Sequence, residues 1–185
     1  MLPVKIYKPS DKNPKVGAAI QFHSSLHGTK KVPVIYINAT KQSKPKPSAG
    51  STESPFDWDN KISMMLNVDE LGEIGAYIRG MSTKSINLVH KSERDGLKVT
   101  VNFTLNKPDT PKAKEYGNWS CALNIKYENG TKDSVPIFLT PGQVYQFLSL
   151  IDGTMTKYYF GTKSPRRNDN GYQDQEAVSG SKITN

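Results

Sequence analysis

The internal repeat is the feature of the sequence that most restricts its fold. Residues 62–80 (ISMMLNVDELGEIGAYIRG) align without a gap on residues 135–153 (VPIFLTPGQVYQFLSLIDG), at a spacing of 73 residues (135 minus 62). Both segments begin with a short apolar run and continue with apolar residues at helical spacing, which predicts a strand leading directly into a helix. The chain is therefore expected to contain two similar units.

Both predicted helices begin with a capping box, in which a cap side chain and a Glu or Gln three residues later satisfy backbone N–H groups. The pairs are Asn67 with Glu70 and Thr140 with Gln143. Proline is favoured at the first helical position, which Pro141 occupies. Gly80 and Gly153 occupy matching positions of the repeat and are predicted to end the helices. The apolar stripes are Leu71, Ile74 and Ile78, and Val144, Phe147, Leu148 and Ile151.

Three further strands are predicted before each strand-helix segment. They span residues 4–9, 17–25 and 32–41 in the first unit, and 85–91, 97–107 and 119–128 in the second. Asp95-Gly96 and Asn129-Gly130 are typical hairpin turns. The predicted fold is α+β, with two tandem four-stranded antiparallel sheet plus helix units related by pseudo-twofold symmetry. The first unit covers residues 1–81 and the second 82–160, packed together as one domain.

The segments outside these elements have a different composition. Residues 42–60 and 107–118 are rich in Pro, Ser, Gly and Lys, so they are predicted to be flexible loops. Residues 161–185 have almost no periodic apolar content and are expected to be disordered unless a partner orders them.

Charge and cysteine content restrict the partners and the compartment. The formal charge of +8 and the pI of about 9.4 favour polyanionic partners, nucleic acid first, although a merely soluble lysine-rich surface gives the same numbers. The single Cys121 rules out an internal disulfide and is predicted to be a core residue in a reducing compartment. No apolar run suggests a membrane span or a signal peptide, so a cytoplasmic protein is expected.

Alternation assigns each strand an inner face, covered by the helices, and an outer polar face. Residues such as Val99, Val101, Phe103, Cys121 and Leu123 are predicted to face in. The predicted outer residues are Lys5, Tyr7, Gln21, His23, Tyr36 and Asn38 in the first unit, and Lys98, Thr100, Asn102, Thr104, Ser120, Asn124 and Lys126 in the second. Lysines, amides, hydroxyls and aromatics together are typical of a surface that binds an unpaired strand, although most antiparallel sheets have a solvated face.

Met65 and Phe138 occupy matching positions of the repeat and are predicted to lie on this polar face. Apolar side chains there favour burial by a stacked base or by a strand of a neighbouring subunit. Homo-oligomers are therefore among the expected assemblies.

Other chemistry has weak support in the sequence. His23, His27 and His90 are too scattered to predict a zinc site. Asp57 and Asp59 flank Trp58, and turn or cap roles explain them more simply than a nuclease metal site. No nucleophile with a base and no phosphate-binding glycine loop is visible, so we expect no catalytic residues, no metal and no cofactor.

The repeated, basic strand-strand-strand-strand-helix unit resembles the superfamily of the transcriptional coactivator positive cofactor four and the plant Whirly proteins. It looks like the tandem kind, and phage-encoded relatives of the coactivator are similar to it. The segment KVGAAIQF at residues 15–22 is similar to a lysine-glycine-lysine-alanine-alanine-leucine segment of a Whirly strand, and Lys15, Gly17, Ala18 and Ala19 match it. The resemblance implies curved sheets whose exposed surface binds single strands, and a host-cytoplasm location if the chain is phage-encoded.

The predicted function is binding of single-stranded DNA with little sequence preference, in support of replication, recombination or transcription. The predicted phosphate contacts are Lys5, Lys61, Lys98 and Lys126; the stacking residues are Tyr7, His23, Tyr36 and Phe138; the sugar or base-edge contacts are Asn38, Asn102, Asn124 and Thr104. The loop with Lys44 and Lys46 is expected to close over the strand. The alternatives are an RNA-binding or annealing module of the same fold and a protein-interaction cofactor of a polymerase.

Overall fold

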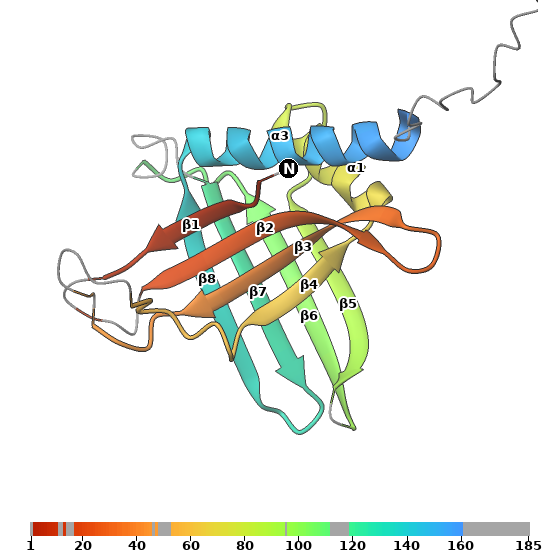
Figure 1. The fold of residues 1–185 in the computed structure, drawn as a ribbon. Coiled ribbons are helices and arrows are strands. Elements are labelled where there is room, and N and C mark those ends of the chain that lie inside the picture. Colours follow the sequence, from red (N-terminus) through yellow and green to blue (C-terminus); the bar gives the residue numbers. More distant parts are fainter. Residues whose placement is uncertain are drawn as a thin grey trace, which may run out of the picture.

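The chain forms two four-stranded antiparallel sheets, each followed by a helix (Figure 1). The computed structural model describes residues 2–10, 13, 17–45, 47, 53–94, 96–111 and 119–160. The first sheet has the order β1 (Val4–Lys8), β2 (Ala18–His27), β3 (Val32–Lys41) and β4 (Ile62–Leu66), and is followed by α1 (Val68–Ile78). The second has the order β5 (Ile86–Arg94), β6 (Leu97–Asn106), β7 (Trp119–Tyr127) and β8 (Lys132–Leu139), followed by α3 (Pro141–Phe160). The predicted fold class is confirmed.

Both predicted capping boxes are present. Asn67 Oδ1 accepts from the Glu70 N–H at 3.0 Å, and Glu70 Oε2 accepts from the Asn67 N–H at 2.9 Å. Thr140 and Gln143 make the matching pair of bonds at 3.3 and 3.0 Å. The two segments spaced by 73 residues therefore fold alike at the strand-helix junction.

The two helices end differently, and the prediction for Gly153 is wrong. Gly80 has a φ of 77° just after α1, and the N–H of Met81 bonds to the Ala76 carbonyl, as in a glycine-terminated helix. α3 instead continues through Gly153 to Phe160. Beyond the glycine, Thr154 is fully buried, so packing of the continuing face offsets the cost of about 1 kcal/mol for glycine in a helix.

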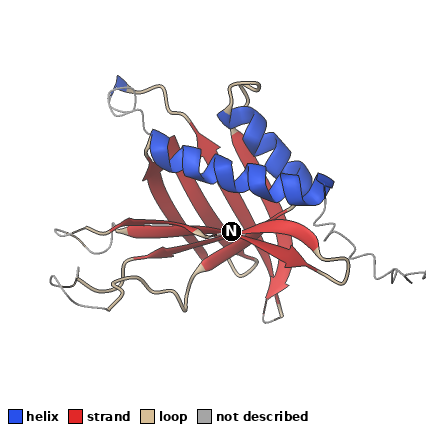
Figure 2. Ribbon diagram, turned by 45° about the horizontal axis from the view of Figure 1, so that its top comes forward, coloured by secondary structure: helices blue, strands red, loops and turns tan. Residues whose placement is uncertain are grey.

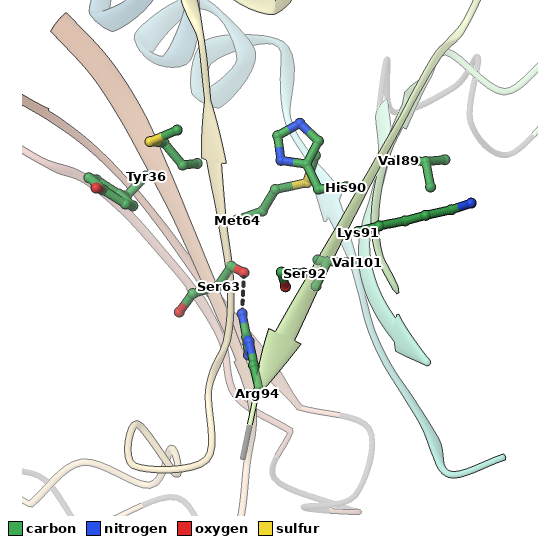
Figure 3. Close-up of a pocket in the computed structure, with 10 residues that line it drawn as sticks. Tyr36, Ser63, Met64, Val89, His90, Lys91, Ser92, Arg94 and Val101 are labelled. Carbon is green, nitrogen blue, oxygen red and sulfur yellow. Dashed lines mark hydrogen bonds between the residues drawn. The ribbon is translucent and has the colours of Figure 1, made fainter. Parts of the chain in front are cut away.

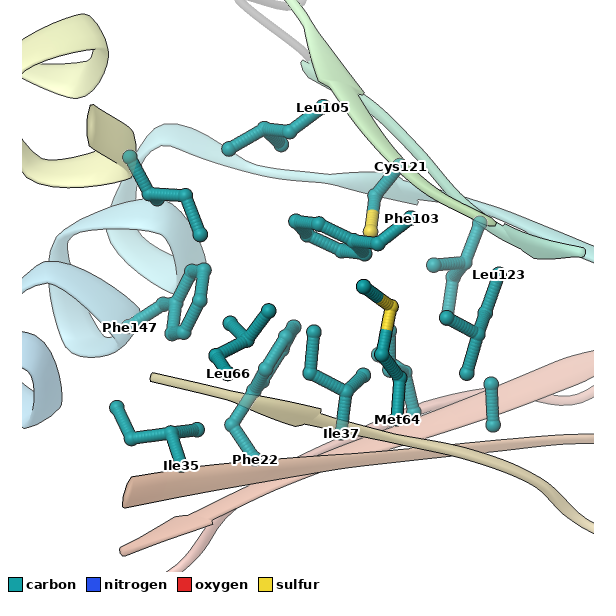
Figure 4. Packing of buried hydrophobic residues seen from close by; sticks show 14 of the residues in the cluster. Phe22, Ile35, Ile37, Met64, Leu66, Phe103, Leu105, Cys121, Leu123 and Phe147 are labelled. Carbon is teal, nitrogen blue, oxygen red and sulfur yellow. The ribbon is translucent and has the colours of Figure 1, made fainter. Parts of the chain in front are cut away.

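The core lies between the inner faces of the two sheets and beneath the helices (Figures 2 and 4). Phe22 of β2 stacks on Phe147 of α3 with ring centroids 4.0 Å apart. Phe103 and Leu123 of the second sheet and Met64 of the first contribute to the same buried cluster. The inner faces are therefore covered by the opposite sheet as well as by the helices, whereas the sequence indicated the helices alone.

An ion pair joins the two helices at matching positions of the repeat. Arg79 follows α1, Asp152 lies in α3, and their side chains are paired. The two residues are 73 positions apart, which equals the repeat spacing. Matching positions of the repeat therefore meet where α1 and α3 pack together.

The connection between β3 and β4 is better ordered than predicted. Phe56 is 7% exposed and forms an isolated bridge with Gln42, and the Thr40 hydroxyl donates to the Asp57 carbonyl. Burial of Phe56 against the sheet explains this order, so the prediction of a flexible loop is wrong for residues 53–60, called here the Phe56 segment. Residues 112–118 and 161–185, also predicted to be flexible, lie outside the described residues.

Candidate nucleic-acid interface

A row of lysines crosses the outer face of the second sheet. Lys91 of β5, Thr100 of β6, Lys126 of β7 and Lys132 of β8 are consecutive register partners. We call these four residues the lysine row. Neighbouring strands lie about 4.8 Å apart, so the row extends roughly 14 Å across the sheet, perpendicular to the strands.

A chain of side-chain hydrogen bonds runs beside the lysine row. Ser134 Oγ donates to Asn124 Oδ1 at 2.5 Å, and Asn124 Nδ2 donates to Asn102 Oδ1 at 3.2 Å. Asn102 Nδ2 in turn donates to Asn87 Oδ1 and, at 3.3 Å, to the Leu88 carbonyl. This amide chain fixes the orientation of its side chains, and it lies two residues along the strands, about 7 Å, from the lysines.

Sequence reasoning identified only part of this surface. It placed Thr100, Asn102, Asn124 and Lys126 correctly on the outer face. The residues that it missed are Asn87, Lys91, Lys132 and Ser134. Continued alternation along the strand predicted at 85–91 would have identified Asn87 and Lys91. Lys132 and Ser134 lie in the first three residues of β8, which precede the repeated segment, so the predicted strand did not include them.

The remaining predicted residues of the second sheet lie at the ends of its outer face. Lys98 is opposite Glu93 in the register, so part of its charge is balanced locally. Thr104 is the partner of Asn87 and Ala122, next to the amide chain. Phe138 lies opposite Ser120 and is 60% exposed, the most exposed aromatic ring on a strand.

On the first sheet an aromatic pair lies next to the edge strand β4. His23 and Tyr36 are register partners whose rings stack at 5.3 Å between centroids, and Met65 is the next partner in the row. Burial lowers the pKa of His23 below the usual value for histidine, so its ring is neutral near pH 7. The Tyr36 hydroxyl is 3.0 Å from His27 Nδ1. These contacts hold the Tyr36 ring in place before any ligand binds.

The next row of the first sheet is polar. Lys5, Gln21, Asn38 and Ser63 are register partners, and Ser63 Oγ donates to Asn38 Oδ1 at 2.7 Å. Lys5 is exposed and the other three are half-buried. This arrangement resembles a shorter version of the amide chain on the second sheet.

The Phe56 segment covers the far end of the first sheet's outer face. Tyr7 packs against Phe56 at 5.6 Å and edge-on against Trp58 at 6.4 Å between ring centroids. Ala19, the register partner of Tyr7, is fully buried although it belongs to the outer set. Tyr7 therefore has one side occupied by protein, and Trp58 joins it as an aromatic that sequence reasoning did not assign to the interface.

The predicted loop lysines have different positions. Lys44 is exposed just after β3, and its carbonyl accepts from Gln42 Nε2 at 2.8 Å. Lys61 Nζ donates to the Trp58 carbonyl at 3.2 Å, so it supports the Phe56 segment. Lys46 lies outside the described residues.

The segment that carries the family resemblance has a structural role at Gly17. A Cβ at Gly17 would lie 1.9 Å from Gln42 Oε1, the atom that accepts the Ser10 N–H at 2.8 Å. Glycine therefore allows this close approach, and Ala18 follows as a buried residue of β2. Lys15 lies outside the described residues.

Side chains considered for other chemistry have structural partners. Cys121 is fully buried, and burial raises its pKa, so the thiol is a core group as predicted. His90 Nε2 lies 2.6 Å from Glu70 Oε1 of the α1 capping box. Asp57 accepts from the Asn60 side chain at 2.8 Å, which lowers its pKa and agrees with the predicted turn role. Within the described part of the chain, no cluster of three or more His, Cys, Asp or Glu suits a metal ion.

No family model and no curated protein matches the sequence. Solved structures do match. WHY3 from Arabidopsis thaliana aligns with a TM-score of 0.54 and 14% identity, over 84% of this chain and 87% of that one. The plant transcriptional regulator PBF-2 aligns with a TM-score of 0.56 and 14% identity, over 86% and 82%. The chain has a Whirly-like fold.

WHY1 from Arabidopsis thaliana gives a similar result, with a TM-score of 0.52, 16% identity and coverage of 84% and 83%. The resemblance suggested by the sequence is therefore confirmed at the level of the Whirly-like fold. In the described ranges, neither helix combines the length and apolar character needed to cross a bilayer.

Proposed function

We propose that the protein binds single-stranded nucleic acid, with a preference for DNA and little preference for sequence, through the outer faces of its two sheets. The lysine row would hold phosphates, while Tyr36 and Phe138 would stack on bases. The amide chain would contact sugars and base edges. Binding needs no catalytic group, metal or cofactor.

The observation that carries the proposal is the lysine row beside the amide chain. Three lysines in one cross-strand row place positive charge along a line, and the chain of amides beside it offers oriented donors and acceptors. A polyanion with hydrogen-bonding groups beside its backbone is complementary to this surface, because its charges are negative and its donors and acceptors can pair with the amides. An ordinary solvated face has no need for either alignment.

The structural comparisons support a role that involves nucleic acid. PBF-2 is described as a plant transcriptional regulator, and the net charge of +8 suits a nucleic-acid ligand. Support of transcription, replication or recombination remains part of this proposal, as do the phage origin and the cytoplasmic location that the sequence resemblance implies.

A salt titration tests the proposal. Affinity should be measured for single-stranded DNA, duplex DNA and RNA of one sequence at several salt concentrations. We expect single-stranded DNA to bind best, with log K falling by about 0.7 for each phosphate contacted per unit of log salt concentration. Absence of binding, or affinity that does not change with salt, would contradict the proposal.

A protein partner is the second candidate, because Phe138 is 60% exposed on a strand. In that case the ring would insert into a polymerase, a transcription protein or a second copy of this chain. An RNA-binding module is separated from the main proposal by the same titration, since an RNA-specific site uses the 2′-hydroxyl.

A further inference from the structure

One hollow lies on the outer face of the second sheet, and a second lies beside it between the edge strands of the two sheets. One, of about 710 Å³, lies over the amide chain and the lysine row and includes Asn124, Lys126 and Val89. The other, a groove of about 500 Å³, lies between the edge strands β4 and β5 (Figure 3). Val89 belongs to the lining of both, so the two hollows border each other at β5.

The groove between β4 and β5 reaches both outer faces. Its lining includes Lys91 of the lysine row on one side and Tyr36 and Met65 of the first sheet on the other. The groove therefore defines a path around this edge of the molecule, from Lys91 of the lysine row to Tyr36 of the aromatic pair.

A basic residue lies in the middle of that path. Arg94 projects from β5 toward β4, and its Nη2 donates to the Ser63 carbonyl at 2.9 Å (Figure 3). This bond uses one of the five N–H donors of the guanidinium, whose planar fork suits phosphate. Lys91 also belongs to the lining, and its side chain points to the side of β5 away from Arg94 (Figure 3), where the path leaves the groove for the second sheet.

We propose that one polynucleotide strand follows this path, crossing the second sheet along the lysine row, passing Arg94 in the groove and continuing over Met65 and Tyr36 of the first sheet. This inference rests on the proposed function and specifies its geometry: both sheets of one chain share one strand. The ligand is therefore a single strand longer than either sheet alone can cover. A duplex is too stiff to follow the turn at the groove.

The path makes a prediction about stoichiometry. One small β-barrel module covers roughly 4–16 nucleotides of a single strand. An oligothymidine of about 5 nucleotides lies near the lower limit of this range, and one of about 20 nucleotides exceeds it. We expect one long strand per chain, bound at least 100-fold tighter than the short one. A long strand that is bound to one sheet is held at a high effective concentration near the other sheet. Two long strands bound independently per chain would overturn the proposal.

Arg94→Gln tests the groove itself. The substitution removes the charge, so we expect about 3- to 10-fold weaker binding of the long strand, a shallower salt dependence and little change for the short strand. Lys157→Gln is the matched control, since Lys157 is an exposed cation on α3, away from the path. Circular dichroism and melting would confirm that both variants fold.

Unchanged affinity of Arg94→Gln for the long strand would overturn the path and leave the groove to another occupant, such as an extended peptide pairing with the two edge strands. That outcome differs from a failure of the proposed function, in which no single strand of either length binds the unmodified protein.

Discussion

Tyr36 and Phe138 are aromatic residues of the two outer faces, but their surroundings differ. Tyr36 is held by His23 and His27, whereas Phe138 is 60% exposed beside Ser120. Substitution of Tyr36 would therefore disturb neighbouring side chains, while substitution of Phe138 removes a ring with little effect on the fold. Phe138 is thus the better probe of stacking.

For Phe138→Ala we expect affinity for single-stranded DNA to fall by about 1–3 kcal/mol, or roughly 5- to 150-fold, because one stacked base loses its platform. Equilibrium binding at fixed salt measures this. Tyr159→Ala is the control, since Tyr159 is 65% exposed near the C-terminal end of α3 and belongs to neither sheet. Equal affinities of the Phe138 variant and the unmodified protein would remove Phe138 from the interface.

His23 gives a prediction about pH. Burial lowers its folded-state pKa, so below about pH 6.5 the unfolded chain takes up a proton that the folded chain resists. The free energy of unfolding should therefore decrease as the pH falls from about 7.5 to 5.5, and His23→Gln should lose less stability over that range. Urea unfolding of both proteins at the two pH values measures the difference; parallel losses would contradict the assignment.

At the scale of elements, local chemistry was the best guide. The capping boxes and Gly80 could be predicted because their bonds lie within a few residues along the chain. Gly153 could not, because burial of Thr154 decides that α3 continues. The Phe56 segment was missed for the same reason: its order comes from contact with Tyr7, about 50 residues away.

The candidate site could likewise be predicted only where local sequence information was sufficient. Alternation was enough to place Asn102 and Asn124 on one face, since it is a property of each strand alone. Their alignment with Ser134 depends on the pairing register, and the meeting of Lys91 with Tyr36 in one groove depends on how the two sheets pack. Those relations are absent from any single segment of the sequence.

The capping box of α3 allows a test of the strand-helix junction. Thr140→Ala removes the hydroxyl that accepts from the Gln143 N–H at 3.3 Å, so we expect a loss of about 1 kcal/mol in the free energy of unfolding. Chemical denaturation measures it. Thr131→Ala, at an exposed turn position, is the comparison and should change stability by less than about 0.5 kcal/mol. Similar losses in both variants would show that the cap contributes nothing particular.

On the scale of the whole molecule, the two sheets share one core. Phe22, Met64, Phe103 and Phe147 belong to a single buried cluster that includes both sheets and both helices. Neither residues 1–81 nor 82–160 can bury its inner face alone. The two units are therefore structural repeats that share a core, and we propose that the described chain unfolds as one domain.

The expected result is a single unfolding transition, with the tryptophans and the far-ultraviolet signal changing together. Trp58 lies on the first sheet's outer side and Trp119 begins β7, so fluorescence and Trp58→Phe and Trp119→Phe variants report on each unit separately. Expression of residues 1–81 alone should yield a poorly folded or self-associating chain. Two separate transitions would show that the units are independent domains.

The pairing of Arg79 with Asp152 has a consequence for how such a molecule could have been assembled. Where two copies of one polypeptide meet on a twofold axis, a residue close to the axis faces its own counterpart, so this position would bring arginine against arginine or aspartate against aspartate. The two repeats of this chain differ at the matching position and therefore place opposite charges together. The pair is about half exposed, so its contribution to stability is small, but its sign favours contact between the two different halves over contact between two copies of one half.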